Sequence, residues 1–226
     1  MASVTQSLAA LLAAGTMLFS GSMDVAAPQN DVDGLLFLVN RGWRVSENYV
    51  PETRMANVQG QVRSMRPDAA EALEEMFAAC KEETGYTPVS VSGYRSYSKQ
   101  NTIYANKLKR VGGSVEKADQ YVARPGASEH QLGLAMDVGQ KNKTSLTDAF
   151  ANTQCGQWLA ENCWRFGFIL RYQAGWEEIT GYNYEPWHVR YVGKENAEAI
   201  YADPKPLEEY LVEVRTQTLL DLLGAE

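Results

Sequence analysis

The stretch "SEHQLGLAMD" (residues 128–137) holds one of the only two histidines in this 226-residue chain. Gly133 argues against a continuous helix here, and the pattern after it predicts a strand over residues 134–139. A turn at Gly133 followed by a strand would bring His130 and Asp137 back toward one point. Taken alone, this pair does not establish a metal site, since a histidine hydrogen-bonded in the core is the more common arrangement.

The second histidine lies in "EPWHVRY" (residues 185–191), three residues after Glu185. Pro186 excludes a regular helix, and Trp187 supplies apolar cover. Two histidines and one aspartate form the three-ligand set of a catalytic zinc whose fourth position holds water, and a nearby glutamate can act as the base for that water. Two structural histidines remain the alternative, although the entire histidine content falls in two carboxylate-bearing segments.

The segments around these motifs mix helical and strand patterns. After Pro67, apolar residues recur at helical spacing as far as Gly85, which is placed as a C-cap. Strands are predicted at 34–43, 87–94, 134–139, 167–172 and 187–193, and helices at 67–84, 98–113, 114–122, 154–166, 194–202 and 206–223. Because they do not alternate as regular βαβ units, we expect an α+β fold with a small central antiparallel sheet flanked by helices.

Composition limits the classes of function. The length suits one domain, and the net charge of −7 argues against a nucleic-acid partner. The one dense basic run, "KLKRV" (107–111), is better explained as a solvated helix face.

The first 40 residues contain no lysine or arginine, and residues 8–19 form an apolar run. That run is short for a transmembrane helix but fits the apolar region of a secretory signal, although the usual basic start is missing. We therefore treat residues 1–27 as a leader and predict one domain over residues 28–226, with a helical C-terminal extension. An uncleaved leader would leave the chain associated with a membrane.

The three cysteines, Cys80, Cys155 and Cys163, form no CxxC motif, so neither a zinc ribbon nor a thioredoxin-type site is indicated. One disulfide in an exported protein and three packed free thiols both remain open.

The two histidine motifs resemble the SxHxxGxAxD and ExxH signatures of the VanY-type zinc D-Ala-D-Ala carboxypeptidase family, part of the group that includes lysostaphin-like peptidases and hedgehog domains. Further stretches resemble that family in the same order, among them "VSGYRSYSKQ" and "WLAENCWRFGFILRY". The resemblance covers about residues 34 to 212, and the paired motifs are highly specific.

The resemblance implies a role for seven residues. One zinc ion per chain is expected on His130, Asp137 and His188, with Glu185 as the catalytic base. Arg95 corresponds to the arginine that holds the substrate carbonyl and the developing oxyanion, Gln100 to a glutamine that helps bind the peptide, and Ser128 to the serine at the substrate's C-terminal carboxylate. Without the resemblance, Arg95 would be interpreted as a surface or sheet-covering arginine. For Arg190, a plain salt bridge is favoured over a place in the cleft.

The implied activity is removal of the C-terminal D-alanine from peptidoglycan stem peptides, at a D,D or an L,D bond. A cell-wall endopeptidase and a D-Ala-D-Ala dipeptidase are alternatives on the same site. A non-catalytic zinc module that binds peptide could dispense with the base and the arginine, yet Glu185 and Arg95 are both present. This substrate requires export to the cell wall of a bacterium, and a monomer is expected.

Overall fold

The centre of the computed structural model, which describes residues 32–222, is a four-stranded antiparallel sheet. Its strands are β3 (Pro88–Ser92), β4 (Ala135–Gln140), β5 (Phe168–Leu170) and β6 (His188–Tyr191), in the order β3-β4-β6-β5. All pairings are antiparallel. The predicted fold class is confirmed. The predicted leader, residues 1–27, lies outside the described residues.

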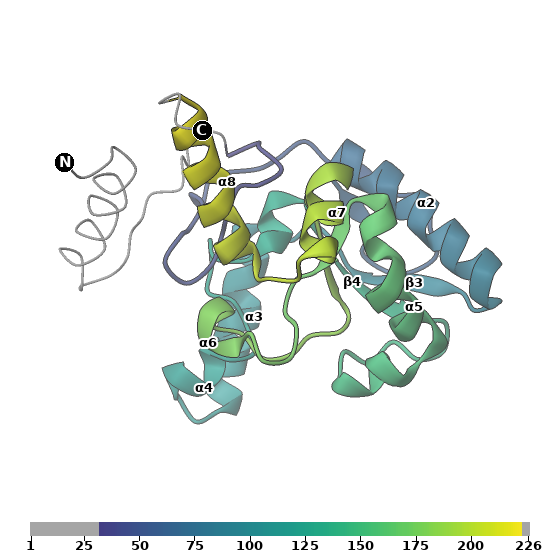
Figure 1. The fold of residues 1–226 in the computed structure, drawn as a ribbon. Helices are drawn as coiled ribbons and strands as arrows, with labels where there is room; N and C mark the ends of the chain where they lie inside the picture. The colour runs from purple at the N-terminus through teal and green to yellow at the C-terminus, as the bar shows by residue number, and fades with distance from the viewer. Residues whose placement is uncertain (1–31, 223–226) are drawn as a thin grey trace.

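Two helices cover one face of this sheet, α2 (Pro67–Thr84) and α5 (Gln154–Asn162) (Figure 1). Pro67 opens α2, and Gly85 ends it in the left-handed conformation with its N–H on the Lys81 carbonyl, as the sequence predicted. The apolar stripes of both helices pack on Met136 and Val138 of β4 and form the main core. Burial on this face fixes the sheet register, because a one-residue slip would turn the apolar side chains outward.

The opposite face of the sheet carries charged residues. Asp137 lies between Met136 and Val138 in β4 and therefore points away from the core. Asp137 and His188 are direct partners across β4 and β6, so their side chains share that face. The side chain of a third residue, Arg190, follows two positions later on the same side of β6. The sheet thus separates an apolar core from a charged site.

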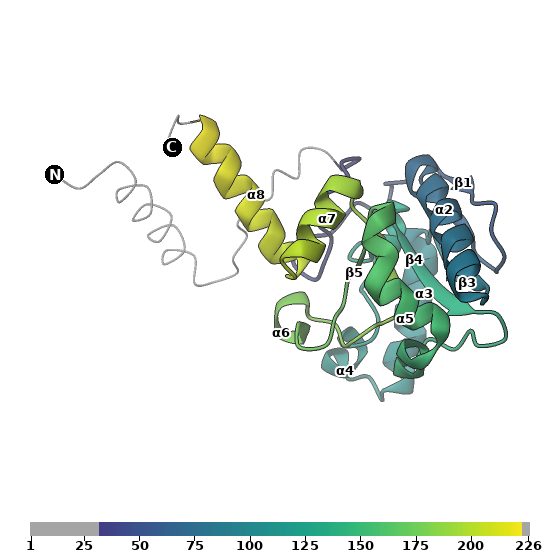
Figure 2. The same cartoon turned by 45° about the vertical axis from the view of Figure 1, so that its right-hand side comes forward.

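The remaining elements lie around the sheet and its two covering helices, and α8 extends away from them (Figure 2). They are β1 (Arg54–Met55), β2 (Ser64–Met65), α3 (Tyr97–Arg110), α4 (Val115–Asp119), α6 (Glu177–Thr180), α7 (Lys194–Ala202), α8 (Leu207–Leu222) and the 3-10 helices η1 (Glu129–Leu132), η2 (Asp148–Asn152) and η3 (Cys163–Phe166). Buried Ile200 of α7 and Leu207 and Leu211 of α8 share a second apolar cluster. The C-terminal helix is therefore packed on the domain at its start.

The prediction of a strand at residues 34–43 is wrong. This segment runs as turns and extended chain, and its backbone groups have other partners. The Arg190 guanidinium donates to the carbonyl oxygens of Leu35 and Phe37, at 2.8 and 2.9 Å, and the Asn40 side chain accepts from two backbone N–H groups in a local turn. The buried Arg190 side chain thus occupies backbone carbonyl groups that would otherwise accept hydrogen bonds from a neighbouring strand.

One further prediction needs correction, and three short elements were not predicted. The helix predicted over 154–166 ends at Asn162 and continues as η3, whose end is marked by Gly167 in the left-handed conformation. The segment 123–133, between the helix predicted at 114–122 and the strand predicted at 134–139, contains η1. The paired strands β1 and β2, two residues each, were not predicted because so short a pairing leaves no periodicity to detect.

All three cysteines are buried and free. Packed thiols, one of the two open alternatives, are therefore what the structure contains. In the described part of the chain, we find no helix with the length and apolar character needed to cross a membrane.

Candidate metal centre and catalytic cleft

A cleft of about 1440 Å³ opens on the charged face of the sheet. All seven residues predicted for the site line it: Arg95, Gln100, Ser128, His130, Asp137, Glu185 and His188. Its volume exceeds the range typical of small-molecule sites, about 300–1,000 Å³, and leaves room for a peptide. The structure therefore brings together residues that are far apart in the sequence.

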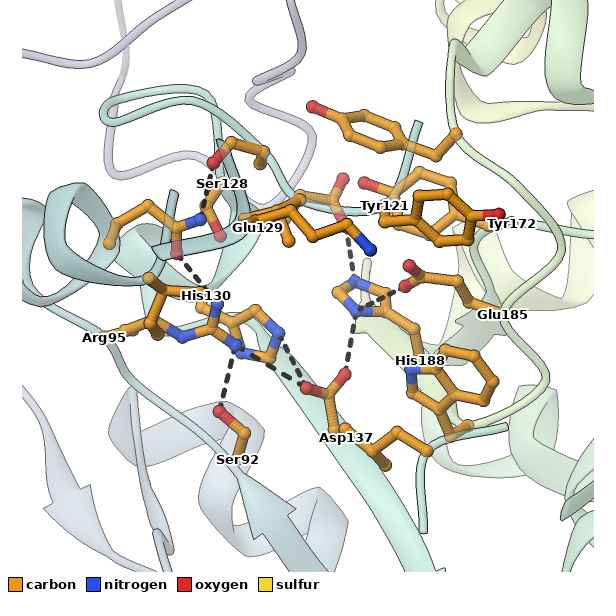
Figure 3. A pocket seen from close by; sticks show the side chains of 18 of the residues that line it. Ser92, Arg95, Tyr121, Ser128, Glu129, His130, Asp137, Tyr172, Glu185 and His188 are labelled. Carbon is orange, nitrogen blue, oxygen red and sulfur yellow. Dashed lines mark hydrogen bonds and ion pairs between the residues drawn. The ribbon is translucent and has the colours of Figure 1, made fainter. Parts of the chain in front are cut away.

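Three potential metal ligands converge at the floor of this cleft (Figure 3). His130 comes from η1, Asp137 from β4 and His188 from β6, and each is only 4% exposed. His130 Nε2 lies 3.3 Å from Asp137 Oδ2, and His188 Nδ1 lies 3.1 Å from Asp137 Oδ1. One ligand atom from each residue falls within 4.8 Å of the others, a spacing that a single ion can bridge.

The second nitrogen of each ring has its own partner. His130 Nδ1 lies 2.9 Å from the Gly93 carbonyl, which can only accept, so this nitrogen carries the proton. His188 Nε2 lies 3.2 Å from Glu129 Oε2. His130 Nε2 and His188 Nδ1 are thereby left for a metal. Two imidazoles and one carboxylate, each anchored from behind, fit the donor set of a catalytic zinc.

Gly133 makes this arrangement possible. It ends η1 at φ 70°, in the left-handed region that favours glycine, and turns the chain into β4. The turn that the sequence predicted between His130 and Asp137 is confirmed.

The two histidines differ in their electrostatic surroundings. Burial and the neighbouring Arg95 charge lower the pKa of His130. Burial also acts to lower the pKa of His188, but its hydrogen bonds to Asp137 and Glu129 outweigh this and raise that pKa to about 9. A metal ion at His188 would compete with a proton for Nδ1.

Glu185 lies beside the ligand cluster. Its Oε2 is 3.9 Å from His188 Nδ1, and its backbone N–H donates to the Tyr172 carbonyl. Burial raises the pKa of the Glu185 carboxyl to about 8. A carboxyl whose pKa lies near neutrality can both accept and return a proton under physiological conditions.

Arg95 faces the cluster from the segment that follows β3, and its Nη2 lies 3.6 Å from Asp137 Oδ2. It donates to Gln100 Oε1 at 2.8 Å and to Ser92 Oγ at 3.0 Å. Gln100 is fully buried, and its amide nitrogen donates to the Ala123 carbonyl at 2.6 Å. Both ends of the Gln100 amide are thus engaged within the protein, which favours a role in holding Arg95 over contact with the peptide.

Ser128 immediately precedes η1 and is 4% exposed, at the edge of the same cleft. Trp187, predicted to provide apolar cover beside His188, is half-buried and packs against the core. Arg190 does not line the cleft and forms the salt bridge that the sequence favoured.

Glu129 is the residue that the sequence analysis missed. Its side chain is fully buried, and its Oε1 accepts from Arg171 Nε and Arg190 Nη1, both at 2.8 Å. Burial acts to raise the pKa of Glu129, but the two guanidinium groups hold it far below the usual range. The available signal was an arginine inside each of two apolar strand patterns, "GFILRY" and "HVRY", since such a buried cation requires a carboxylate partner.

The family model of D-alanyl-D-alanine carboxypeptidases named VanY matches residues 62–194, more than half of the chain. The chain belongs to the VanY family. As a member, it is a zinc-dependent carboxypeptidase, in agreement with the ligand set described above. The resemblance seen in the two histidine motifs is thereby confirmed.

Three relatives illustrate the match. Bacillus subtilis (strain 168) YodJ is 42% identical over 191 residues, which are 81% of this chain and 69% of YodJ. The LD-carboxypeptidase LdcB is 43% identical with a TM-score of 0.74, covering 80% of this chain and 86% of LdcB. A mutant of the D,D-pentapeptidase VanY in complex with Zn(II) is 37% identical with a TM-score of 0.66, covering 78% of this chain and 98% of that one.

Proposed function

We propose that this chain removes the C-terminal D-alanine from peptidoglycan stem peptides. The observation that carries the proposal is the convergence of Glu185 and Arg95 on one cleft with the cluster of His130, Asp137 and His188. A non-catalytic peptide-binding module would need neither group beside the metal. The VanY-family relatives include an LD-carboxypeptidase and a D,D-pentapeptidase, which supports a stem-peptide substrate.

His130 Nε2, the Asp137 carboxylate and His188 Nδ1 would hold the zinc ion. A zinc ion at this place lowers the pKa of water and polarises a carbonyl oxygen. Glu185 takes the proton from the attacking water and returns it to the amine of the departing D-alanine. One carboxyl thus acts as base and then as acid, for which its raised pKa suits it.

Arg95 supplies a second source of stabilisation. Amide hydrolysis passes through a tetrahedral oxyanion, and a guanidinium fixed beside the reacting carbonyl stabilises that charge as it develops. Arg95 is fixed by Gln100 and Ser92, so little reorganisation is needed during the reaction. Ser128, at the edge of the cleft, is proposed to donate to the terminal carboxylate of the peptide.

Helix α3 (Tyr97–Arg110) adds positive charge to the cleft. Lys99, Lys107 and Arg110 line the cleft from this helix, and none forms an ion pair with a carboxylate of residues 32–222. Lys107 Nζ lies 3.8 Å from the centre of the Tyr121 ring, which holds the ammonium group at the cleft. In a chain of net charge −7, these cations favour a substrate that carries negative charge.

The same activity implies a place of action. Stem peptides lie in the bacterial cell wall, so we propose that the chain is exported and acts as a monomer, with one peptidase domain over residues 28–226. Sequencing the N-terminus of the mature protein would identify a cleaved leader, and sedimentation would give the oligomeric state.

The test is mass spectrometry of muropeptides incubated with the zinc-loaded protein. Pentapeptide, tetrapeptide, a pentapeptide with a C-terminal carboxamide, a cross-linked muropeptide and free D-Ala-D-Ala are compared side by side. Loss of one D-alanine from the pentapeptide or the tetrapeptide, but not from the carboxamide, is expected, and the better substrate defines the bond. Cleavage of the cross-linked form or of the dipeptide alone would instead identify an endopeptidase or a dipeptidase.

A further inference from the structure

Behind the ligand cluster lies a network of four charged side chains linked one to the next, in the order Arg190, Glu129, Arg171 and Glu208. The two arginines and Glu129 are fully buried, and the Glu208 side chain is 14% exposed. Arg171 bridges the two carboxylates, since its Nε donates to Glu129 at 2.8 Å while Nη1 and Nη2 donate to Glu208 at 2.9 and 2.6 Å. Two negative and two positive charges leave this network neutral.

The network touches the metal centre at one point, the His188 ring. Glu129 follows Ser128 and precedes His130 in the sequence, yet its side chain turns to the other histidine. Its Oε2 lies 3.2 Å from His188 Nε2 (Figure 3). A carboxylate only accepts, so Nε2 keeps its proton and Nδ1 is the nitrogen left to bind a metal.

We infer that Glu129 is a positioning residue for His188 and that Glu208 of α8 completes this function through Arg171. Glu129 fixes the orientation and tautomer of the ring, and its charge makes Nδ1 a stronger ligand. Glu208 neutralises the second arginine. Without Glu208, two buried guanidinium groups would share one carboxylate, and their surplus positive charge would oppose a metal cation nearby.

The functional unit thus extends beyond the residues that the family model matches. Glu208 lies in the first turn of α8, after the matched segment 62–194. It is held there by buried Leu207 and Leu211 on either side, and Asn40 also donates to it at 3.4 Å. The start of the C-terminal helix is therefore linked to a zinc ligand by three consecutive ion pairs or hydrogen bonds.

This inference rests on the proposed ligand set, so the experiment reads metal binding without substrate. The Zn²⁺ dissociation constant is measured by competition with a chromogenic chelator at one pH, together with the visible spectrum of the Co²⁺-loaded protein. Glu129→Gln, which keeps the shape of the side chain, should weaken Zn²⁺ binding about 10- to 100-fold and shift the Co²⁺ spectrum. Glu208→Gln should weaken it in the same direction by a smaller factor.

The competing explanation is that the network only stabilises the fold. Leu159→Ala is the control, because Leu159 is buried in the core on the far face of the sheet and its loss lowers the melting temperature without touching the network. It should leave Zn²⁺ affinity unchanged. Wild-type affinity in folded Glu129→Gln and Glu208→Gln overturns the inference.

If Glu129→Gln does not fold, Glu208→Gln decides alone: weaker binding supports the inference, and unchanged binding overturns it. Failure of the ligand set itself gives a different result, namely a wild-type protein that binds no stoichiometric zinc or a His188→Ala variant that still binds it.

Discussion

The two histidines of this chain are held by opposite means on the two sides of one site. On the β3 side, His130 Nδ1 is hydrogen-bonded to the neutral carbonyl of Gly93, and the nearby Arg95 guanidinium acts to lower the pKa of the ring. On the β6 side, His188 Nε2 is hydrogen-bonded to the buried carboxylate of Glu129. The pKa of His130 is lowered and that of His188 is raised to about 9, although both rings are equally buried.

This difference shows how one cluster can serve both metal binding and catalysis. The β6 side provides negative charge behind a ligand, which favours a cation. The β3 side provides positive charge beside the cluster, where an oxyanion would develop. Asp137, the direct cross-strand partner of His188, joins the two sides.

The largest effect is expected from removing either histidine. His130→Ala and His188→Ala should each lose stoichiometric zinc, and hydrolysis should fall to that of the chelator-treated protein, because two remaining ligands hold zinc poorly. Added zinc should raise the melting temperature of the wild type but of neither variant, since only binding to the native state stabilises it. If either variant keeps its full zinc content, the histidine that was replaced is not a zinc ligand.

Glu185→Gln separates chemistry from metal binding on the β6 side. Zinc content measured by atomic absorption should stay at one ion per chain, while kcat falls about 10²- to 10⁴-fold because no group can accept the proton of water. Asn183→Ala, a nearby residue of the same cleft, is a control that should keep most of kcat. Near-wild-type turnover in Glu185→Gln would refute its assignment as the base.

Arg95→Met tests the β3 side in the same way. Loss of the oxyanion partner should lower kcat about 10²- to 10³-fold in a steady-state assay, with zinc content unchanged. Lys109→Met on α3 also removes one positive charge, but Lys109 does not line the cleft, so its kcat should stay near that of the wild type. Equal losses in both variants would mean that net charge, and not the position of Arg95, is what matters.

Gln100→Leu gives the smallest expected effect. It tests whether Gln100, on the β3 side, holds Arg95 in place or contacts the peptide. A hydrogen bond to a charged group contributes about 1.5–3 kcal/mol, so a loosened Arg95 should lower kcat roughly tenfold or more, with KM nearly unchanged. The exposed neighbour Asn101→Leu serves as the matched control. A rise in KM at constant kcat would instead support the contact with the peptide that the family resemblance implies.

Much of this site could be predicted from the sequence because its signals are local. Gly133 marks a turn, Pro186 excludes a helix, and two histidines beside carboxylates suggest a ligand set. Pro67 and Gly85 likewise bound α2 where the pattern placed it. The sheet of the α+β fold could also be predicted, because each of its four strands has an apolar pattern of its own.

The sequence could not show which side chains compete for the same partner. The apolar run 34–43 has the composition of a strand, and only the tertiary structure gives its carbonyl groups to Arg190. The same holds for Glu129, which local order places next to His130 but whose contact is with His188, 59 residues away. Local residue type determined the motifs and their chemistry, whereas the pairing of buried charges was decided by packing, because a buried charge must find its partner wherever the fold brings one.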